Sequence, residues 1–202
     1  MSRLTNLNRL LPLVAIGTVA DCQSIIDPVN RLLVSAGIQI IQKNIHQIEG
    51  LNQLLSQSGV NEKIKQGYKI TSQDLGFLLS PILNSSGRIS HARLSIATMI
   101  ADNDDQNNRP NCSKIVQENE KYLNQSTSNL AKNLIQTNQD RKQMVKEILS
   151  QVNQEAKQQY DNGQQILWLE GKWNKGIIGL LASRLVNEYN LPVVVISNND
   201  EE

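Results

Sequence analysis

Three separated groups of residues in the sequence could act on a phosphate. Asp21 follows an apolar run, and open α/β sheets place their ligands at the carboxyl ends of such strands. Arg88 lies among small residues, where its planar guanidinium could hold a phosphate. Gly176 and Gly179 precede an apolar helical pattern, and a helix N-terminus offers free N–H groups to an anion. Each residue also has an ordinary role, as a cap, a solvated side chain or a site of close packing.

A βαβ unit is predicted for residues 165–197. A short apolar run at 165–169 is bounded by Gly163 and Gly171, and apolar residues then recur at helical spacing over 177–186. Pro192 ends that helix, and VVVI at 193–196 is typical of a strand buried on both faces. The crossover in such a unit is right-handed. The complete G-x-G-x-x-G pattern is absent, so a dinucleotide-binding turn is not predicted.

The first part of the chain is predicted to contain a strand followed by helices. Residues 10–16 read as the strand, with Asp21 just beyond its end. A helix begins at Pro28, which suits the first helical position, and Gly37 could break it. A second, short helix is predicted for residues 50–58, closed by a glycine.

A capping box is predicted at residues 71–74, TSQD, with Asp74 in place of the usual Glu or Gln. It opens a helix that we expect Pro81 to end. The residues at 81–89 then form a small-residue turn that carries Arg88, and a further helix follows over 91–101.

A polar linker and a long helix are predicted in the middle of the chain. Residues 102–111, DNDDQNNRPN, lack the glycine and glutamate of a calcium loop and read as a solvated connection. From Ser113 to residue 159 there is neither Gly nor Pro, and apolar residues form a stripe interrupted at Thr127, Asn138 and Arg141. Such a helix would span roughly 65–70 Å and could bridge two domains. A coiled-coil dimer is the alternative, which the polar interruptions disfavour.

Composition sets broad limits on the function. The chain has 202 residues, a net charge of +1 and 39% hydrophobic residues, so a nucleic-acid surface would have to be a local patch. Cys22 and Cys112 are isolated, which indicates neither a zinc site nor a disulfide framework. The apolar run at 10–16 is too short to span a bilayer, and no signal-peptide pattern follows it. We expect a soluble, cytoplasmic protein without a membrane partner.

Three segments together resemble the RecJ family, the single-strand-specific 5′→3′ DNA exonucleases of the DHH phosphoesterase superfamily. LVAIGTVAD at 13–21 is similar to the family's LGTVAD segment, and PILNSSGRI at 81–89 is similar to its PRLNAAGRL turn. WNKGIIGLLASRL at 173–185 is similar to its WHPGVIGIVASRL segment. The order and spacing agree, and the segments cover nearly the whole chain.

The resemblance implies an α/β fold with two lobes. Residues 1–105 would be the end of a DHH-type parallel-sheet domain, 106–160 a linker and long connecting helix, and 161–202 the start of a DHHA1 α/β domain. Single-stranded DNA would run between the lobes. In that family two divalent ions, Mn²⁺ or Mg²⁺, activate a water for attack on the scissile phosphate.

The resemblance also implies roles for individual residues. Asp21 matches a metal-binding aspartate and is the one candidate for the chemistry. Arg88 matches a contact to the DNA backbone, and Asn84 shapes its turn. The DHHA1 signature, which begins at Trp173 and includes Gly176, Gly179, Ser183 and Arg184, is assigned to packing and to binding of the strand.

The departures from the family pattern predict a catalytically incomplete chain. The Asp-x-Asp and Asp-His-His motifs are absent, and neither His46 nor His91 follows an aspartate. The Gly-Ser-x-Arg-Ser segment that helps hold a 5′ phosphate is also absent, and Asn174 stands where histidine is common. We therefore expect a fragment or one piece of a split gene, inactive or nearly so alone, whose partner would be the missing N-terminal DHH portion.

Two other functions remain open from the sequence. One is a non-catalytic single-strand-binding or scaffold module, in which Trp173 would be a stacking platform and basic residues would contact the backbone: Arg88, Arg93, Lys172, Lys175 and Arg184. The other is a DHH phosphodiesterase for small oligonucleotides or cyclic dinucleotides. The Trp-x-x-Gly-Ile-Ile-Gly form of the signature favours RecJ over that group.

Overall fold

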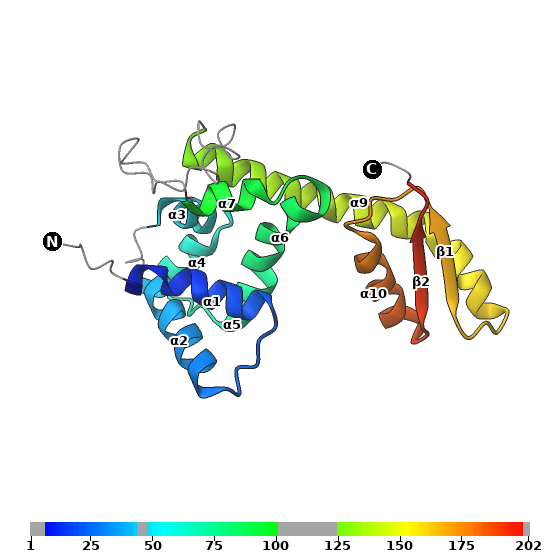
Figure 1. Cartoon of the computed structure of the whole chain (residues 1–202), viewed down its shortest axis with the longest axis horizontal. Helices are drawn as coiled ribbons and strands as arrows, with labels where there is room; N and C mark the ends of the chain where they lie inside the picture. The colour runs from blue at the N-terminus through cyan, green and yellow to red at the C-terminus, as the bar shows by residue number, and fades with distance from the viewer. Residues whose placement is uncertain (1–6, 44–47, 101–124, 200–202) are drawn as a thin grey trace.

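The structure, a computed structural model, describes residues 7–43, 48–100 and 125–199. Helices make up the first part of the chain, and a small parallel sheet with one helix makes up the last part (Figure 1). One long helix, α9 (Thr127–Asp161), runs along both parts. The linker predicted at 102–111 and the start of the predicted long helix, up to residue 124, lie outside the described residues, as do His46 and Cys112.

Short helices form the first part. In chain order they are η1 (Leu7–Leu10), α1 (Leu11–Ala20), α2 (Pro28–Lys43), α3 (Glu49–Gln57), α4 (Val60–Lys65), α5 (Ser72–Asp74), the π-helix η2 (Leu75–Leu79), α6 (Ser80–Ile89) and α7 (Arg93–Ile100). α1 packs against α2, and α3, α6 and α7 pack against α9. The parallel sheet that we expected here is not found between residues 7 and 100 as far as they are described.

Helix α1 replaces the strand predicted for residues 10–16. Pro12 lies in its first turn, where a missing N–H breaks no helical hydrogen bond. α2 crosses α1 so closely that a Cβ on Gly37 would lie 2.4 Å from the carbonyl oxygen of Leu11 and 2.5 Å from Cβ of Ala15. Gly37 therefore permits this crossing and does not break α2. A short apolar run fits a buried helix as well as a buried strand, which is why the pattern misled the prediction.

Helix α6 replaces the turn predicted for residues 81–89. The capping box at Thr71 and Asp74 is confirmed, but the helix that it opens does not end at Pro81. The π-helix η2 intervenes, and both the backbone N–H and the hydroxyl of Ser80 donate to the carbonyl of Leu75. This wider turn shifts the backbone hydrogen bonds, so that Pro81 enters the first turn of α6 instead of interrupting a regular helix.

Helix α9 is the connecting element that the sequence predicts. The hydroxyl of Ser126 caps its first turn by accepting a hydrogen bond from the N–H of Asn129. Its 35 residues span about 52 Å. The predicted stripe is buried within this chain, including Leu130, Leu134 and Val145. Other elements of the same chain thus cover the apolar stripe that would form the interface of a coiled-coil dimer.

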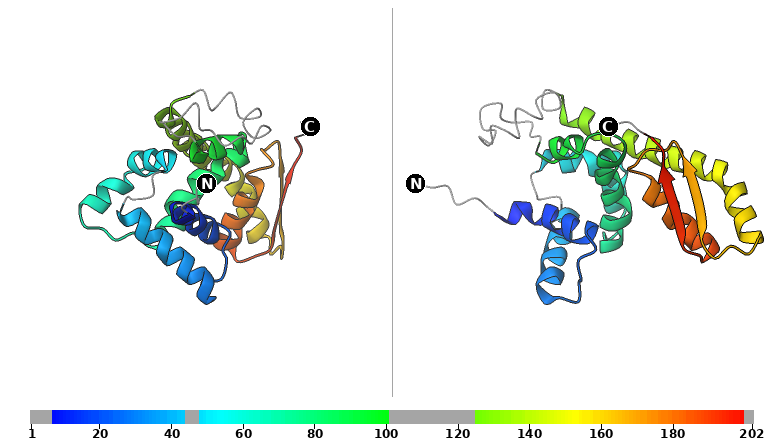
Figure 2. Two further views of the ribbon diagram at one scale, coloured as in Figure 1. Left: turned by 60° about the vertical axis from the view of Figure 1, so that its left-hand side comes forward. Right: turned by 45° about the vertical axis from the view of Figure 1, so that its right-hand side comes forward.

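The βαβ unit is present as predicted. Strand β1 (Leu167–Gly171), helix α10 (Ile178–Tyr189) and strand β2 (Val193–Ser197) follow in order, and the strands are parallel, with Leu167 opposite Val193. Asn190 ends α10 in the left-handed region, at φ +53°. β2 is half-buried along its length, so it is not covered on both faces as we expected. Figure 2 shows both strands beside the end of α9.

Two hydrophobic cores lie along α9. The first core comprises Ala15, Ile16, Ile41, Ile48, Leu51, Leu54, Leu55, Val60, Ile70, Leu75, Leu79, Ile82, Leu94, Ala97, Leu130 and Leu134. The second core comprises Val145, Ile148, Val152, Ala156, Leu167, Leu169, Ile177, Leu181 and Leu185. Because α9 contributes to both, it fixes the spacing between them. Within the described part of the chain, no helix has the length and apolar character needed to cross a membrane.

Candidate nucleic-acid interface

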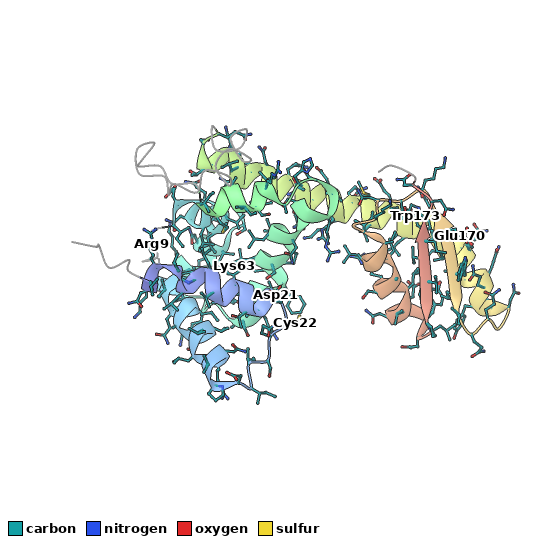
Figure 3. All side chains as sticks on the ribbon, in the orientation of Figure 1. Arg9, Asp21, Cys22, Lys63, Glu170 and Trp173 are labelled. Carbon is teal, nitrogen blue, oxygen red and sulfur yellow. The ribbon has the colours of Figure 1, made fainter. Side chains whose placement is uncertain are left out.

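Asp21, the predicted metal ligand, lies exposed at the C-terminal end of α1, and not at the end of a strand (Figure 3). Its N–H donates to the carbonyl of Gly17, and the next residue, Cys22, has a positive φ of 53° just after the end of the helix. Over residues 7–43, 48–100 and 125–199, no three His, Cys, Asp or Glu side chains gather where they could hold a metal ion. The described residues thus do not form a metal site by themselves, and Asp21 offers one carboxylate.

Arg88 and Gly176, from two separate predicted segments, meet where the two cores adjoin. Nη1 of Arg88 donates to the carbonyl oxygen of Gly176 at 3.1 Å. A Cβ on Gly176 would lie 2.0 Å from the carbonyl oxygen of Arg88, so only glycine permits this approach. Ile89, the next residue, packs against the second core. The end of α6 is therefore a second connection between the cores, besides α9.

Asn84 lies one turn before Arg88 on α6, and residues four apart share a helix face. Asn84 is exposed and Arg88 is half-buried. The pair therefore lies on one face of α6, and Arg88 is the member nearer the junction of the cores. The predicted turn would not have aligned these side chains, whereas the helix does.

Arg141 is a residue of this junction that the sequence interpretation did not identify. It lies on α9 between Ile135, which packs on the first core, and Met144, which packs on the second. Burial, followed by the positive charges of Arg88 and Arg184, lowers the pKa of Arg141. The sequence showed Arg141 only as an interruption of an apolar stripe. An arginine within an otherwise buried helical stripe was the available signal.

Trp173 is half-buried and packs against the second core (Figure 3). A Cβ on Gly171 would lie 2.4 Å from its ring, so one region of the indole is covered by the chain itself. Its backbone carbonyl accepts hydrogen bonds from the side chains of Ser197 and Asn199. Trp168, on β1, is 50% exposed, and is the more open of the two indoles.

The two glycines of the DHHA1-like segment differ in their surroundings. Gly176 contacts Arg88 of the first part of the chain, whereas a Cβ on Gly179 would meet nothing within 4 Å. Close packing of α10 on the sheet is therefore not the reason for a glycine at either position. The N–H of Gly176 already donates to Oδ1 of Asn174 at 2.7 Å, so it is not free for a phosphate.

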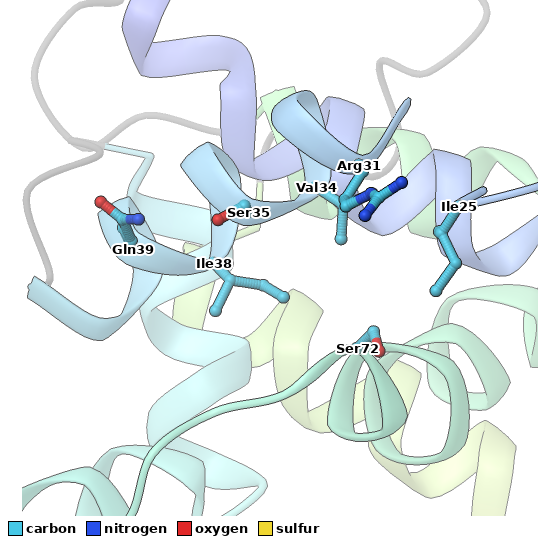
Figure 4. Close-up of a pocket in the computed structure, with 7 residues that line it drawn as sticks. All are labelled: Ile25, Arg31, Val34, Ser35, Ile38, Gln39 and Ser72. Carbon is cyan, nitrogen blue, oxygen red and sulfur yellow. The ribbon is translucent and has the colours of Figure 1, made fainter. Parts of the chain in front are cut away.

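A shallow pocket of about 250 Å³ lies between α2 and the start of α5 (Figure 4). It is lined by Ile25, Arg31, Val34, Ser35, Ile38, Gln39 and Ser72. None of the residues predicted for metal or nucleic-acid binding contributes to it. The structure brings two of the predicted residues, Arg88 and Gly176, into contact at the junction of the two cores.

The curated relatives of this chain are single-stranded-DNA-specific exonucleases. All of them are RecJ proteins, to which the chain is homologous over about 95% of its length. It is 26% identical to RecJ of Bacillus subtilis over 195 residues and 29% identical to RecJ of Dickeya dadantii over 196 residues. These alignments cover 96% and 95% of this chain, but 21% and 29% of the relatives. No family model matches.

Solved structures of RecJ share the fold. RecJ of Thermus thermophilus in complex with Mg²⁺ superposes with a TM-score of 0.68 at 20% identity, over 94% of this chain and 25% of that one. An exonuclease RecJ bound to manganese gives a TM-score of 0.66 at 19% identity, over 94% of this chain and 40% of that one. The predicted resemblance is confirmed, and the chain spans about a fifth to a third of the curated relatives' length.

Proposed function

We propose that this chain contributes the strand-holding part of a RecJ-like single-stranded-DNA-specific 5′→3′ exonuclease that acts in DNA repair and recombination. The observation that carries the proposal is the contact of Arg88 with Gly176. This contact joins the segments at 81–89 and 173–185, which both resemble RecJ, and it lies at the junction between the two cores. The homology over about 95% of the chain supports the same assignment.

In this proposal the polar side chains at the junction contact the DNA backbone. Asn84, Arg88 and Arg184 supply hydrogen bonds and positive charge, which give binding that weakens as salt rises. Trp173 supplies a partial stacking surface. Gly176 shapes the backbone just before α10, and Gly179 shapes it within that helix. Neither glycine takes part in the hydrolysis of the phosphodiester.

Asp21 would contribute one carboxylate to a Mn²⁺ or Mg²⁺ site whose other ligands lie outside the described residues. Hard carboxylate oxygens suit both ions. The ions would supply the activation of water for phosphodiester hydrolysis. The division into a DHH part at 1–105, a connection at 106–160 and a DHHA1 part at 161–202 belongs to the same proposal.

The test is binding of a fluorescent single-stranded oligonucleotide across a salt series, with and without Mn²⁺, while cleavage is followed in parallel. We expect salt-sensitive binding without cleavage by this polypeptide. Absence of binding at low salt would contradict the proposal. Mn²⁺-dependent cleavage that Asp21→Ala abolishes, and Glu62→Ala on the exposed face of α4 does not, would contradict the expected inactivity.

A non-catalytic strand-binding module makes the same binding prediction, so a second measurement separates the two. A polypeptide that carries an Asp-His-His motif, taken from a RecJ relative, is added to this chain. The exonuclease proposal expects Mn²⁺-dependent cleavage from the mixture, lost in Asp21→Ala. Binding without cleavage in every mixture favours the module.

A further inference from the structure

Helix α2 has two apolar faces, and its own chain buries one of them. Val34, Gly37 and Ile41 are buried, and this face packs on α1. A second set of apolar side chains recurs at helical spacing and forms another stripe along α2: Val29, Leu32, Leu33, Ala36 and Ile40. A helix on the surface of a soluble protein usually has one apolar face and a polar face opposite it. The second stripe therefore indicates a second covering surface.

The start of this stripe and the loop before it form an exposed apolar surface. Val29 and Leu32 are 63% and 69% exposed, and Ile25 and Ile26, in the loop between α1 and α2, are 48% and 83% exposed. We call these four residues the α2 patch. Single apolar residues on a surface are ordinary, but a group of large aliphatic side chains so close together marks an interaction site. Figures 1 and 2 show α2 at the margin of the first part of the chain.

Hydrogen bonds hold the loop that carries the two isoleucines. Oδ1 of Asp27 accepts hydrogen bonds from two N–H groups in the first turn of α2, at 2.8 and 3.1 Å. The side-chain amide of Asn30 donates to the carbonyl of Ser24 at 3.0 Å, and Nη2 of Arg31 donates to the carbonyl of Ile26 at 3.1 Å. The exposed side chains are therefore presented on a fixed backbone. A partner that binds the patch does not have to order this loop first, which favours affinity.

The length of the relatives and the position of Asp21 indicate which polypeptide covers the patch. The matched part makes up 21% and 29% of two RecJ relatives, so those enzymes contain much further polypeptide. Asp21 lies four residues before Ile25, at the end of α1, and the described residues gather no metal site around it. A polypeptide that covers the patch lies beside Asp21. The same polypeptide can therefore bring further carboxylates and histidines to this aspartate.

We propose that the α2 patch is the docking surface for the part of a RecJ-like enzyme that carries the Asp-His-His motif. The inference rests on the proposed function and adds to it the surface through which the two parts join. The four side chains supply affinity by leaving water. No member of the patch is charged, so the matching surface on the other part is apolar as well. Docking there fixes the position of Asp21 relative to that part.

The first arm of the test measures binding of this chain to the RecJ-derived polypeptide that carries the Asp-His-His motif. Calorimetric titration in EDTA excludes any contribution from a metal ion. We expect Leu32→Asp to weaken binding about tenfold or more, because docking would bury an unpaired carboxylate. Ile96→Asp is the control, since Ile96 is 46% exposed on α7, which packs against α9. That variant should bind as the wild type does.

The second arm maps the contact without a charged substitution. In a chain with Cys22→Ser and Cys112→Ser, a single thiol is introduced by Val29→Cys or by Ile96→Cys. The rate of its reaction with a thiol reagent is measured with and without the RecJ-derived polypeptide. At a polypeptide concentration about ten times Kd, we expect the reaction in the Val29→Cys variant to slow about tenfold. The reaction in the Ile96→Cys variant should keep its rate. Unchanged rates in both would overturn the inference, even if Leu32→Asp does not fold.

Two results with this chain alone would also overturn the inference. Leu32 is exposed, so Leu32→Asp should leave the urea midpoint close to that of the wild type. A large loss of stability would mean that the chain covers the patch itself. Size-exclusion chromatography should show the same species for both proteins. A wild-type dimer that becomes a monomer in Leu32→Asp would assign the patch to a second copy of the chain.

Oligonucleotide binding by this chain separates the inference from the proposed function. Leu32→Asp should leave that binding unchanged, because the proposed strand contacts lie on other elements. If the wild type binds the oligonucleotide but docks no RecJ-derived polypeptide, or docks it equally well as Leu32→Asp, the inference fails and the strand-holding function stands. If it binds no oligonucleotide but docks the polypeptide through the patch, the function fails and the docking surface stands.

Discussion

At the scale of single residues, the contact between Arg88 and Gly176 joins the two hydrophobic cores. A backbone carbonyl of α6 occupies the space that a side chain at position 176 would fill. Backbone cannot move aside as the end of a flexible side chain can. The junction therefore depends on glycine at this position, whatever ligand it binds.

Gly176→Ala should destabilise the chain by about 1–3 kcal/mol, because the added methyl overpacks the junction. Gly179→Ala is the matched control, since its Cβ would enter open space. That change should be neutral or stabilising by up to about 1 kcal/mol, the usual gain of alanine over glycine within a helix. Urea unfolding of both variants measures the difference. Equal free energies of unfolding would contradict the contact between Arg88 and Gly176.

Asp74 is a second residue whose environment gives a measurable effect. Burial raises the pKa of its carboxyl, but hydrogen bonds from the backbone N–H and hydroxyl of Thr71 and from the hydroxyl of Tyr68 outweigh it and lower the pKa overall. A depressed pKa in the folded state means that the stabilisation is present above the unfolded value, about 3.9, and is lost as pH falls through the folded value.

Asp74→Ala should therefore lower the free energy of unfolding at pH 7 by about 1 kcal/mol, the usual value of a helix cap. The difference from the wild type should begin to shrink below about pH 4, where the carboxyl of the unfolded chain becomes protonated, and should go on shrinking until the pH passes below the lower pKa of the folded state. Gln73→Ala, at the exposed neighbouring position, serves as the control. Urea unfolding at several pH values checks this, and a pH-independent difference would contradict it.

At the scale of elements, α9 also protects the edge of the sheet. The side-chain amide of Gln159 accepts a hydrogen bond from the N–H of Trp168 at 2.8 Å and donates to its carbonyl at 2.7 Å. These are the bonds that a neighbouring strand would make to β1. An unpaired edge strand is a template for association with other chains, so one glutamine partly closes this edge.

Gln159→Ala should remove both bonds and lower the free energy of unfolding by about 1–2 kcal/mol. It should also increase self-association at high concentration, because the edge of β1 becomes free. Gln158→Ala, at the exposed position beside it, is the control. Denaturant unfolding and light scattering measure the two effects, and identical behaviour of the two variants would remove Gln159 from this role.

The elements that the sequence predicted correctly are those with strong local signals. The capping box needs only Thr71 and Asp74 at their spacing, and the βαβ unit has apolar runs of the right lengths with Pro192 between them. The strand predicted for residues 10–16 was wrong because this segment packs against Gly37 of α2 in the tertiary structure. A short apolar pattern carries no information about such packing and fits a buried helix equally well. Arg141 was missed for the same reason, since only the fold places this position of α9 between the two cores.

At the scale of the whole molecule, two connections set the arrangement of the cores. The first is the continuous backbone of α9 between Leu134 and Val145, and the second is the end of α6 at Arg88. A strand that binds between the cores would need this arrangement to be fixed before it arrives, because ordering the cores on binding would weaken affinity.

Asp140→Pro tests the first connection. Proline within a helix removes a backbone hydrogen bond, clashes with the preceding turn and costs about 3 kcal/mol or more. Because position 140 lies between the cores, we expect each core to remain folded while their separation becomes variable. Asp140→Ala keeps the helix and is the control.

Spin labels placed at the exposed positions Lys65 and Lys157, after Cys22 and Cys112 are replaced by serine, report the distance between the two parts of the molecule. The distribution should be narrow in the control and broad in Asp140→Pro. The contact of Arg88 with Gly176 remains in that variant and should limit the broadening. Adding Gly176→Ala should then broaden the distribution by more than the sum of the two single changes, because each connection compensates for loss of the other. Additive broadening would mean that the connections act independently, and that the junction does not hold the cores as a unit.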